Sequence, residues 1–317
     1  MITFPDEVKA AYSRSKNIIR KTPLDHSPSL SNIIDGDVYL KLDNIQKTGS
    51  FKFRGAISKM TSLNEKQRKK GVVTASTGNH GAAVSLGMKI LGINGSIIVP
   101  ENIAPNKVEN IKNLGGTVEY YGNDCLEAEQ RAQEISVTTG AIYISPYNDP
   151  VIVAGQGTMG VELDEDLSNI DTVIVAVGGG GLISGIGGYL KTVQPNVEII
   201  GCSPKNSCVM YESLNAGKQL DLPSKPTLSD GTAGGVEFGS ITFEMCKEII
   251  DDFTVVSENE IAKGIHIGLE KNHQLIEGAA GAAIAGFINQ KEKFKGQTVV
   301  LVMCGGNISS AVLKSIL

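Results

Sequence analysis

The sequence predicts an α/β fold with parallel sheets, and three observations support that prediction. Short apolar segments rich in Val and Ile alternate along the chain with segments whose apolar residues recur at helical spacing. The glycines, 37 of 317 residues, gather in loops that directly follow the apolar segments. No repeat period and no low-complexity segment interrupts the alternation. Alternation of this kind is typical of parallel sheets, because two parallel strands need a crossover connection that is usually a helix.

Eight segments have the composition and length of strands, and they are spread from one end of the chain to the other. They span residues 38–42, 71–76, 95–100, 117–122, 141–145, 171–177, 198–203 and 298–304. Two of the helices between them carry terminal signals. The Gly115-Gly116 pair is suited to a left-handed cap that ends a helix, and Asp124 is suited to an N-cap that begins the next one.

The domain division has to be inferred from the order of these segments, because no Pro- or Ser-rich linker divides the chain. The polar segment "SPYNDP" at 145–150 resembles a return crossing between two domains. We therefore expect a small inserted domain at 53–148 and a large domain made of 1–52 and 149–317. A ligand would bind between the two domains, at the carboxyl ends of the strands.

The composition indicates a globular protein with a small-molecule ligand. A formal net charge of −5 disfavours nucleic acid or an anionic membrane surface as the main partner, since both are bound through basic patches. No apolar run reaches the roughly 18 residues of a membrane helix, and the N-terminus lacks a secretory apolar core. Five cysteines without a C-x-x-C pair fit reduced thiols better than disulfides. We therefore expect the protein in the cytoplasm.

The strongest local signal is the run of glycines from Gly178 to Gly181, between the apolar segment 171–177 and a predicted helix. The backbone N–H groups of such a loop can converge, and the helix N-terminus adds partial positive charge, so the loop is suited to a phosphate. The dinucleotide pattern G-x-G-x-x-G fails, because its sixth position counted from Gly179 is Ser184, and no Walker A pattern occurs. A monophosphate fits best, and the alternative is a tight turn chosen for close packing.

A second loop, "TASTGNHGAAVS" at 74–85, also follows a predicted strand and opens a helix. It would present backbone N–H groups and short polar side chains at the helix start, which suits a carboxylate. The residues concerned are Ser76, Thr77, Gly78, Asn79 and His80. Ser, Thr and Asn are also ordinary N-caps, so the loop alone leaves both interpretations open.

Lys52 lies between Phe51 and Phe53, just after a Gly-Ser corner. If Ser50 caps the following helix, four apolar residues at helical spacing form its buried face, and Lys52 lies beside that face. These four residues are Phe53, Ala56, Ile57 and Met60. Partial burial would lower the pKa of the amine and make it available as a nucleophile, including for a Schiff base. The alternative is a lysine whose stem packs on apolar side chains while its ammonium stays in water.

Together, a monophosphate loop, a carboxylate loop and an amine nucleophile describe a site for pyridoxal 5'-phosphate and an amino acid. The chain resembles the fold type II pyridoxal-phosphate enzymes, the tryptophan synthase β-like group, and within it the serine/threonine dehydratase and serine racemase family. The similarity covers almost the whole chain and rests on four motifs. They are "TGSFKFRGA" at 48–56, "STGNHG" at 76–81, "GGGGLISG" at 178–185 and "MCGGN" at 303–307. The resemblance implies two three-layer α/β/α domains with mostly parallel sheets.

The resemblance also implies a role for each matching residue. Lys52 would form the Schiff base with the cofactor, Phe51 would pack near its ring, and Asn79 would bond to its 3-oxygen. Cys304 would face the pyridine nitrogen, although a small buried core residue is the alternative. The remaining roles are the phosphate site at Gly178, Gly179, Gly180 and Gly181, and the substrate-carboxylate site at Ser76, Thr77, Gly78, Asn79 and His80.

The implied reaction is a β-elimination by an ammonia-lyase, or dehydratase. Lys52, once displaced by the substrate's amino group, would take the proton from Cα, and hydroxide would leave from Cβ. The products would be a 2-oxo acid and ammonia. A neutral Cys304 would leave the pyridine nitrogen largely unprotonated, which favours loss of a β-leaving group. The default substrates are L-threonine and L-serine, and a bulkier hydroxy amino acid such as 3-hydroxyaspartate or phenylserine is an alternative.

The chain departs from the family at positions that bear on other activities. Thr77 stands where the racemases place a serine that acts as a second acid/base. Its hydroxyl keeps Thr77 a candidate catalytic residue, but its added methyl group ranks racemase below dehydratase. Ser203 stands where several relatives have the glutamate of a divalent-cation site, and His266 and His273 lack metal spacing, so no metal is expected. Glu277 would either approach the cofactor or lie in solvent at a helix end.

Two further expectations concern the protein as a whole. The resemblance implies a homodimer, although no residue of this sequence proves one. A non-catalytic binding or regulatory protein that kept the fold is the alternative to an enzyme.

Overall fold

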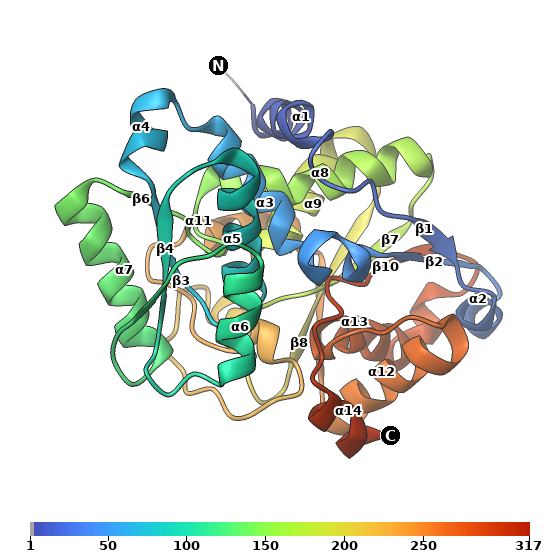
Figure 1. Cartoon of the computed structure of the whole chain (residues 1–317). Coiled ribbons are helices and arrows are strands. Elements are labelled where there is room, and N and C mark those ends of the chain that lie inside the picture. The colour runs from blue at the N-terminus through green and yellow to red at the C-terminus, as the bar shows by residue number, and fades with distance from the viewer. Residues whose placement is uncertain (1–2) are drawn as a thin grey trace.

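The computed structural model describes residues 3–317, and its strands form two separate sheets (Figure 1). The larger sheet has six strands in the order β1-β2-β10-β7-β8-β9, and every neighbouring pair is parallel except β1 with β2. Its strands are β1 (Leu24–His26), β2 (Asp37–Lys41), β7 (Thr172–Ala176), β8 (Glu198–Pro204), β9 (Asp252–Val256) and β10 (Thr298–Val302).

The smaller sheet has four strands in the order β5-β4-β3-β6, and all its neighbouring pairs are parallel. Its strands are β3 (Val72–Ala75), β4 (Gly95–Val99), β5 (Val118–Tyr120) and β6 (Ile142–Tyr143). All four lie within the stretch 53–148 that the sequence predicts as an inserted domain. The domain boundaries themselves stay a prediction, because the helix that begins at Lys52 packs on helices of both halves.

Helices connect the strands throughout the described residues. They are α1 (Phe4–Ser15), α2 (Pro28–Ile34), α3 (Lys52–Ser62), α4 (Glu65–Lys70), α5 (Asn79–Leu91), α6 (Pro105–Asn113), α7 (Cys125–Thr139), α8 (Pro150–Asp166), α9 (Gly181–Val193), α10 (Val209–Ala216), α11 (Ile241–Ile249), α12 (Glu258–Asn272), α13 (Gly278–Asn289) and α14 (Ser310–Ile316). None of the helices in residues 3–317 is both long enough and apolar enough to cross a bilayer.

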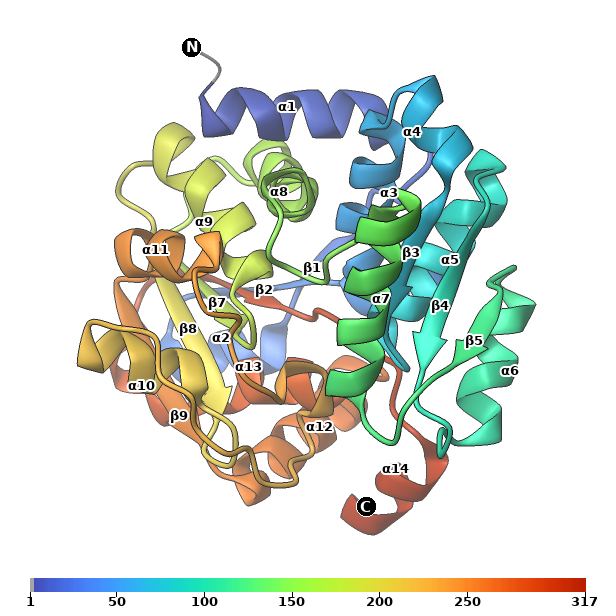
Figure 2. The same ribbon diagram turned by 90° about the vertical axis from the view of Figure 1, so that its left-hand side faces the viewer.

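Each sheet is covered by helices on both faces. Figure 2 shows α8, α9 and α11 on one face of the larger sheet, with α12 and α13 on the other. α1 packs on α8 and α9, and α10 packs on α11. In the smaller sheet, α7 contacts β3 and β4 on one face, and α5 contacts the same strands from the other. The predicted α/β fold, with two three-layer units and mostly parallel sheets, is therefore confirmed.

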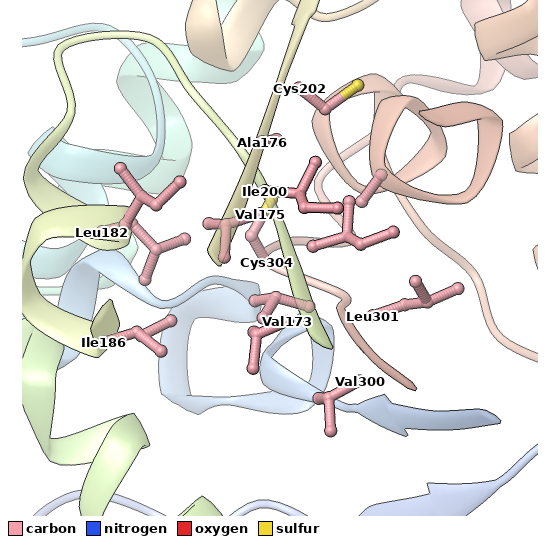
Figure 3. Close-up of a cluster of buried hydrophobic side chains, with 14 of the residues drawn as sticks. Val173, Val175, Ala176, Leu182, Ile186, Ile200, Cys202, Val300, Leu301 and Cys304 are labelled. Atoms are coloured by element: carbon pink, nitrogen blue, oxygen red, sulfur yellow. The ribbon is translucent and has the colours of Figure 1, made fainter. Parts of the chain in front are cut away.

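The main hydrophobic core lies between the larger sheet and its helices. Figure 3 shows the side chains of Val173 and Val175 from β7 and of Val300 from β10 on one side of the strands and that of Leu301 from β10 on the other, all of them fully buried. Burying a side chain of this size contributes about 1.5–3 kcal/mol to folding. β7 and β10 are apolar on both faces, as strands covered by helices on both sides are, and they lie in the middle of the strand order.

All eight predicted strands are present, with ends that differ by no more than a few residues, and two strands were missed. β1 has only three residues, and β9 begins in the acidic stretch at Asp251 and Asp252, so neither shows a clear apolar run. The predicted helix ends are also present. The carboxylate of Asp124 accepts a hydrogen bond from the N–H of Glu127, and Gly115 has φ +93°.

A buried ion network joins α3 to the larger sheet and to α8. Arg54 donates to both carboxylate oxygens of Asp43, at 2.6 and 2.8 Å, and to both of Glu162, at 2.7 and 2.9 Å. Lys41 on β2 lies 2.7 Å from Glu162, and these four side chains are fully buried. The charge of Arg54 contributes to holding the pKa of Glu162 below its ordinary value, although burial alone would raise it. The network fixes α3 two residues from Lys52.

Candidate active site

Lys52 is the first residue of α3, and Phe51, rather than the predicted Ser50, is the residue that caps this helix. The four apolar residues predicted for its buried face, Phe53, Ala56, Ile57 and Met60, are buried as expected. The Nζ of Lys52 donates a hydrogen bond of 2.9 Å to the backbone oxygen of Pro146 and lies 5.2 Å from the centre of the Phe51 ring. Burial lowers the pKa of the Lys52 ammonium from 10.5 to about 8, against smaller opposing effects of Cys304 and Glu277.

The loop before Lys52 is held by the segment that follows β10. The backbone N–H of Phe51 donates to the backbone oxygen of Cys304 at 2.9 Å, and Ser50 pairs with Gly305 in an isolated bridge. Thr48 in this loop has φ +69°, which is uncommon for a β-branched residue. The backbone that carries Lys52 is therefore held in place by its contacts with the "MCGGN" segment.

The four-glycine loop follows the carboxyl end of β7 and leads into α9. Gly180 caps α9 with φ +82°, a conformation that favours glycine. Among the described residues, no acceptor is bonded to the backbone N–H groups of Gly178, Gly179, Gly180 or Gly181. Four unpaired N–H groups at a helix N-terminus are the donor set that a phosphate requires, and no basic side chain is needed to complete it.

The ring of Tyr147 packs directly on this loop. A Cβ added to Gly179 would lie 2.5 Å from two carbons of the Tyr147 ring, and one added to Gly181 would lie 3.0 Å from its Cβ. The Tyr147 hydroxyl accepts a hydrogen bond of 2.8 Å from the backbone N–H of Glu237, which holds the ring in place. The glycines are therefore required partly by the neighbouring aromatic ring.

The "STGNHG" loop follows the carboxyl end of β3 and opens α5. Gly78 is the N-cap of this helix, and no side chain caps it, so the interpretation of Ser, Thr or Asn as an N-cap is wrong here. The side chain of Ser76 instead accepts a hydrogen bond of 3.2 Å from the N–H of Gly78. All five predicted carboxylate-site residues, Ser76, Thr77, Gly78, Asn79 and His80, line the same cleft as Lys52.

His80 has a structural contact as well as a place at the cleft. It is buried, and its Nε2 lies 2.9 Å from the backbone oxygen of Ile144. Burial, with the nearby charge of Lys52, lowers the pKa of His80 to about 3. The ring is therefore neutral at physiological pH, and Nε2 donates its hydrogen to that oxygen.

Two adjoining cavities meet at Lys52. The larger, of about 730 Å³, contains the "STGNHG" loop and extends to α6 and α7. The smaller is lined by Phe51, Cys304, Tyr147, Thr232 and the loop from Gly178 to Gly181. Five residues line both cavities: Lys52, Asn79, Pro146, Gly231 and Glu277. The amine of Lys52 thus lies at the junction of a narrow pocket and an open cleft.

Glu277 lies at this junction, and the alternative of a solvent-exposed acid at a helix end is therefore wrong. Its side chain is 4% exposed, and it accepts hydrogen bonds from the Asn79 amide at 2.9 and 3.1 Å and from the backbone N–H of Asn307 at 3.1 Å. Burial raises the pKa of Glu277 to about 7, and the hydrogen bonds only partly offset it. Glu277 can therefore hold or release a proton near neutral pH.

Cys304 lies on the wall of the smaller pocket, directly after β10. Its side chain is 2% exposed, and burial raises the pKa of its thiol well above the ordinary value, with Glu277 adding to the effect. The thiol is therefore neutral at physiological pH. A neutral group at this place agrees with the sequence-based expectation, and its contact with a pyridine nitrogen stays a prediction.

The structure places no metal-binding cluster among the described residues. No group of three or more His, Cys, Asp or Glu side chains in residues 3–317 lies close enough to hold an ion. Ser203 is buried, and its hydroxyl donates to the backbone oxygen of Val177 at 2.7 Å.

Comparisons with known proteins agree with this fold and site. The sequence model of the family described as "Pyridoxal-phosphate dependent enzyme" matches residues 16–305, which is most of the chain. The chain therefore belongs to the pyridoxal-phosphate dependent enzyme family.

Individual relatives cover almost all of the chain. It is 42% identical to an L-threonine ammonia-lyase of Thermotoga maritima over 317 residues, 100% of this chain and 78% of the relative. It is 36% identical to a catabolic L-threonine dehydratase of Escherichia coli, over 96% of this chain and 92% of that protein. Among solved structures, maize serine racemase matches with a TM-score of 0.93 and 31% identity, over 99% of this chain and 97% of the maize chain. A threonine deaminase of Solanum lycopersicum matches with a TM-score of 0.93 and 33% identity, over 99% of this chain and 91% of the tomato chain.

The residues present fit the cofactor of this family. The smaller pocket combines unpaired backbone donors from Gly178 to Gly181, an amine of lowered pKa at Lys52, and the Asn79 amide beside them. Sequence reasoning missed two residues at the site. Tyr147 lies in the "SPYNDP" segment, which suggested only a crossing, and Asn307 ends the "MCGGN" motif without an assigned role.

Proposed function

We propose that the protein is a pyridoxal-phosphate dependent ammonia-lyase that removes water from a 3-hydroxy amino acid. L-threonine and L-serine are the proposed substrates, and a 2-oxo acid and ammonia are the products. The observation that carries the proposal is the position of Lys52, whose amine lies where the glycine-lined pocket meets an open cleft of about 730 Å³, large enough to admit an amino acid. The relatives with the higher identities support it, because their names are those of threonine ammonia-lyases and dehydratases.

The cofactor would be held by residues of the smaller pocket. The N–H groups from Gly178 to Gly181 would bind its phosphate, Phe51 and Tyr147 would pack beside it, and Lys52 would hold its aldehyde carbon covalently. When bound, pyridoxal phosphate supplies a conjugated ring that accepts the electron pair left when the substrate's Cα proton departs. Cys304, as a neutral thiol, would not stabilise a positive charge on the pyridine nitrogen, which favours rapid β-elimination.

The substrate would be oriented by the "STGNHG" loop. The backbone N–H groups of Thr77, Asn79 and His80 have no acceptor among the described residues, and they lie at the N-terminus of α5, where partial positive charge attracts a carboxylate. Binding the carboxylate there would place the rest of the amino acid in the cleft that contains Lys52.

Lys52 would then act as the base. With its pKa lowered to about 8, a substantial fraction of the free amine is neutral at physiological pH, so Nζ can accept the proton from the substrate's Cα. Thr77 lies in the same cleft, but its methyl group and restricted χ1 make its hydroxyl less free than that of a serine to act as a second acid/base. Elimination is therefore proposed ahead of racemisation.

The proposal is tested with a panel of hydroxy amino acids. Purified protein is supplied with pyridoxal phosphate and given L-threonine, L-serine, 3-hydroxyaspartate or phenylserine, and both ammonia and 2-oxo acid are measured. We expect turnover of L-threonine or L-serine, its loss in Lys52→Ala, and its retention in Lys47→Ala, a lysine of the same loop outside both cavities. Chiral analysis of the remaining serine reports racemisation. Absence of ammonia from all four compounds, or full activity in Lys52→Ala, contradicts the proposal.

Two further proposals concern the protein as a whole. We propose that it is a homodimer, which the size in solution would test, and that it acts in the cytoplasm, which localisation in the intact cell would test. The family resemblance supports the homodimer, and the five free thiols support the cytoplasm.

A further inference from the structure

Asn307 makes contacts that join three separate segments at the site. Its side-chain nitrogen donates to the backbone oxygen of Thr48 at 2.8 Å and to the side-chain oxygen of Asn79 at 2.7 Å. Its backbone N–H donates to Glu277 at 3.1 Å. The segments joined are the loop that carries Lys52, the start of α5 and the start of α13.

These contacts decide which way the amide of Asn79 points. A side-chain amide has an acceptor oxygen and a donor nitrogen of nearly the same shape, so its neighbours determine its orientation. The Asn307 amide donates to the side-chain oxygen of Asn79. The Asn79 nitrogen donates to the carboxylate of Glu277, which can only accept. Rotating the Asn79 amide by half a turn would place donor against donor and acceptor against acceptor. Its nitrogen is therefore fixed on the side of Glu277, at the junction of the two cavities.

The contact with Thr48 serves the lysine loop in the same way. Thr48 has φ +69°, and Gly49, at φ +73°, packs so closely on Asn307 that a Cβ there would lie 2.6 Å from its side-chain oxygen. A positive φ at a threonine costs free energy and persists only where surrounding contacts impose it. The two N–H bonds of the Asn307 side chain are both used, one on each segment.

We propose that Asn307 is a positioning residue, which fixes the Asn79 amide with its nitrogen toward Glu277 and ties the Lys52 loop to the start of α5. The inference rests on the proposed function, in which this pocket binds pyridoxal phosphate. Asn307 acts through Asn79 and Thr48, and it need not touch the cofactor itself.

The change Asn307→Asp keeps the shape of the side chain and removes both donors. The new carboxylate faces the oxygens of Thr48 and Asn79, so Asn79 turns its nitrogen toward position 307 and its oxygen toward Glu277. We expect cofactor affinity to fall about 2- to 10-fold, the equivalent of one net hydrogen bond, because Asn307 is exposed and Asn79 is half-buried. In the proposed function the Asn79 nitrogen also donates to the 3-oxygen of the cofactor, so its loss should shift the visible spectrum of the bound cofactor toward the form with a protonated 3-oxygen.

The matched control is Asn196→Asp, the same chemical change at an exposed residue away from both cavities. It should bind the cofactor with wild-type affinity and give the wild-type spectrum. If Asn307→Asp lowers only the thermal stability and leaves the spectrum unchanged at every pH, Asn307 is a structural residue and the proposal is wrong.

A double-mutant cycle in the protein freed of cofactor tests the contact without reference to function. Asn307→Ala, Asn79→Ala and the double variant are compared by denaturant unfolding. Because the two side chains share one hydrogen bond, the double variant should lose less stability than the sum of the single losses. Additive losses overturn the inference. A wild-type chain that takes up no cofactor overturns the proposed function instead, and the cycle still decides whether Asn307 holds Asn79.

Discussion

Replacing Gly179 by alanine tests whether the glycine loop is shaped by the ring that packs on it. The added Cβ would lie 2.5 Å from Cδ1 and Cγ of Tyr147 and 2.7 Å from its Cε1. Carbon atoms that are not bonded approach to about 3.5–4.0 Å, so the ring or the loop must move by about 1 Å. The ring cannot move freely, because its hydroxyl is held by the N–H of Glu237 at 2.8 Å.

The expected magnitude follows from the cost of overpacking. An extra methyl group in a packed site costs about 1–3 kcal/mol. If the strain falls on the phosphate-binding conformation of the loop, the dissociation constant for pyridoxal phosphate rises about 5- to 150-fold. The assay is a titration of protein freed of cofactor, followed by the absorbance of the bound cofactor. Gly235→Ala is the control, because a Cβ there meets nothing within 4 Å and the backbone needs no positive φ.

A second variant isolates the cause. Tyr147→Ala removes the atoms that the new methyl group would meet, so Gly179→Ala should weaken binding much less in that background than in the wild type. The reasoning is refuted if Gly179→Ala binds the cofactor as tightly as the wild type, or if its effect is the same size with and without the Tyr147 ring.

Three further predictions follow from charges at and near the site. Glu162→Gln leaves buried Arg54 with one anionic partner fewer and should lower the free energy of unfolding by about 3–5 kcal/mol. The control Glu165→Gln, in an exposed ion pair, should lower it by less than about 1 kcal/mol. Equal losses of the two variants in denaturant unfolding would contradict this prediction. The rate at which cofactor-free protein captures pyridoxal phosphate should rise with pH and level off above about 8, since only the neutral Lys52 amine reacts; a rise that continues toward 10.5 would show an ordinary lysine. Glu129 lines the larger cleft, where its carboxylate would repel the side-chain carboxylate of 3-hydroxyaspartate. Glu129→Gln removes that screened repulsion and should raise turnover of 3-hydroxyaspartate relative to L-threonine about tenfold. An unchanged ratio would place Glu129 away from the substrate side chain.

Much of the fold could be predicted from local sequence because its central strands are buried on both faces. β7 and β10 are continuous apolar runs, and the loops that follow them contain the glycines and Cys304. Edge elements gave weaker signals. β1 has three residues, and β9 begins at an acidic residue and lies at the edge of the sheet, so neither needs a continuous apolar sequence.

The site also has residues that short motifs predict and contacts that only the folded chain creates. Lys52, Asn79 and the loop from Gly178 to Gly181 lie in short motifs, and the fold brings them to adjoining cavities as expected. The burial of Glu277 depends on Asn79 and Asn307, which are 198 and 30 residues away along the chain, and no local pattern reports it. The contact of Tyr147 with Gly179 is likewise set by packing. Ser50 was expected to cap α3 because of its residue type, but its backbone pairs with Gly305 instead.

The central claim, that the amine of Lys52 is the covalent anchor of the cofactor, is tested most directly by chemical trapping. Protein loaded with pyridoxal phosphate is reduced with borohydride, digested with trypsin and mapped by mass spectrometry. The reduced cofactor should be found on the peptide spanning residues 48–54, with cleavage after Lys52 blocked by the modification. A reduced adduct confined to another lysine, or no adduct on protein that has bound the cofactor, would contradict the claim.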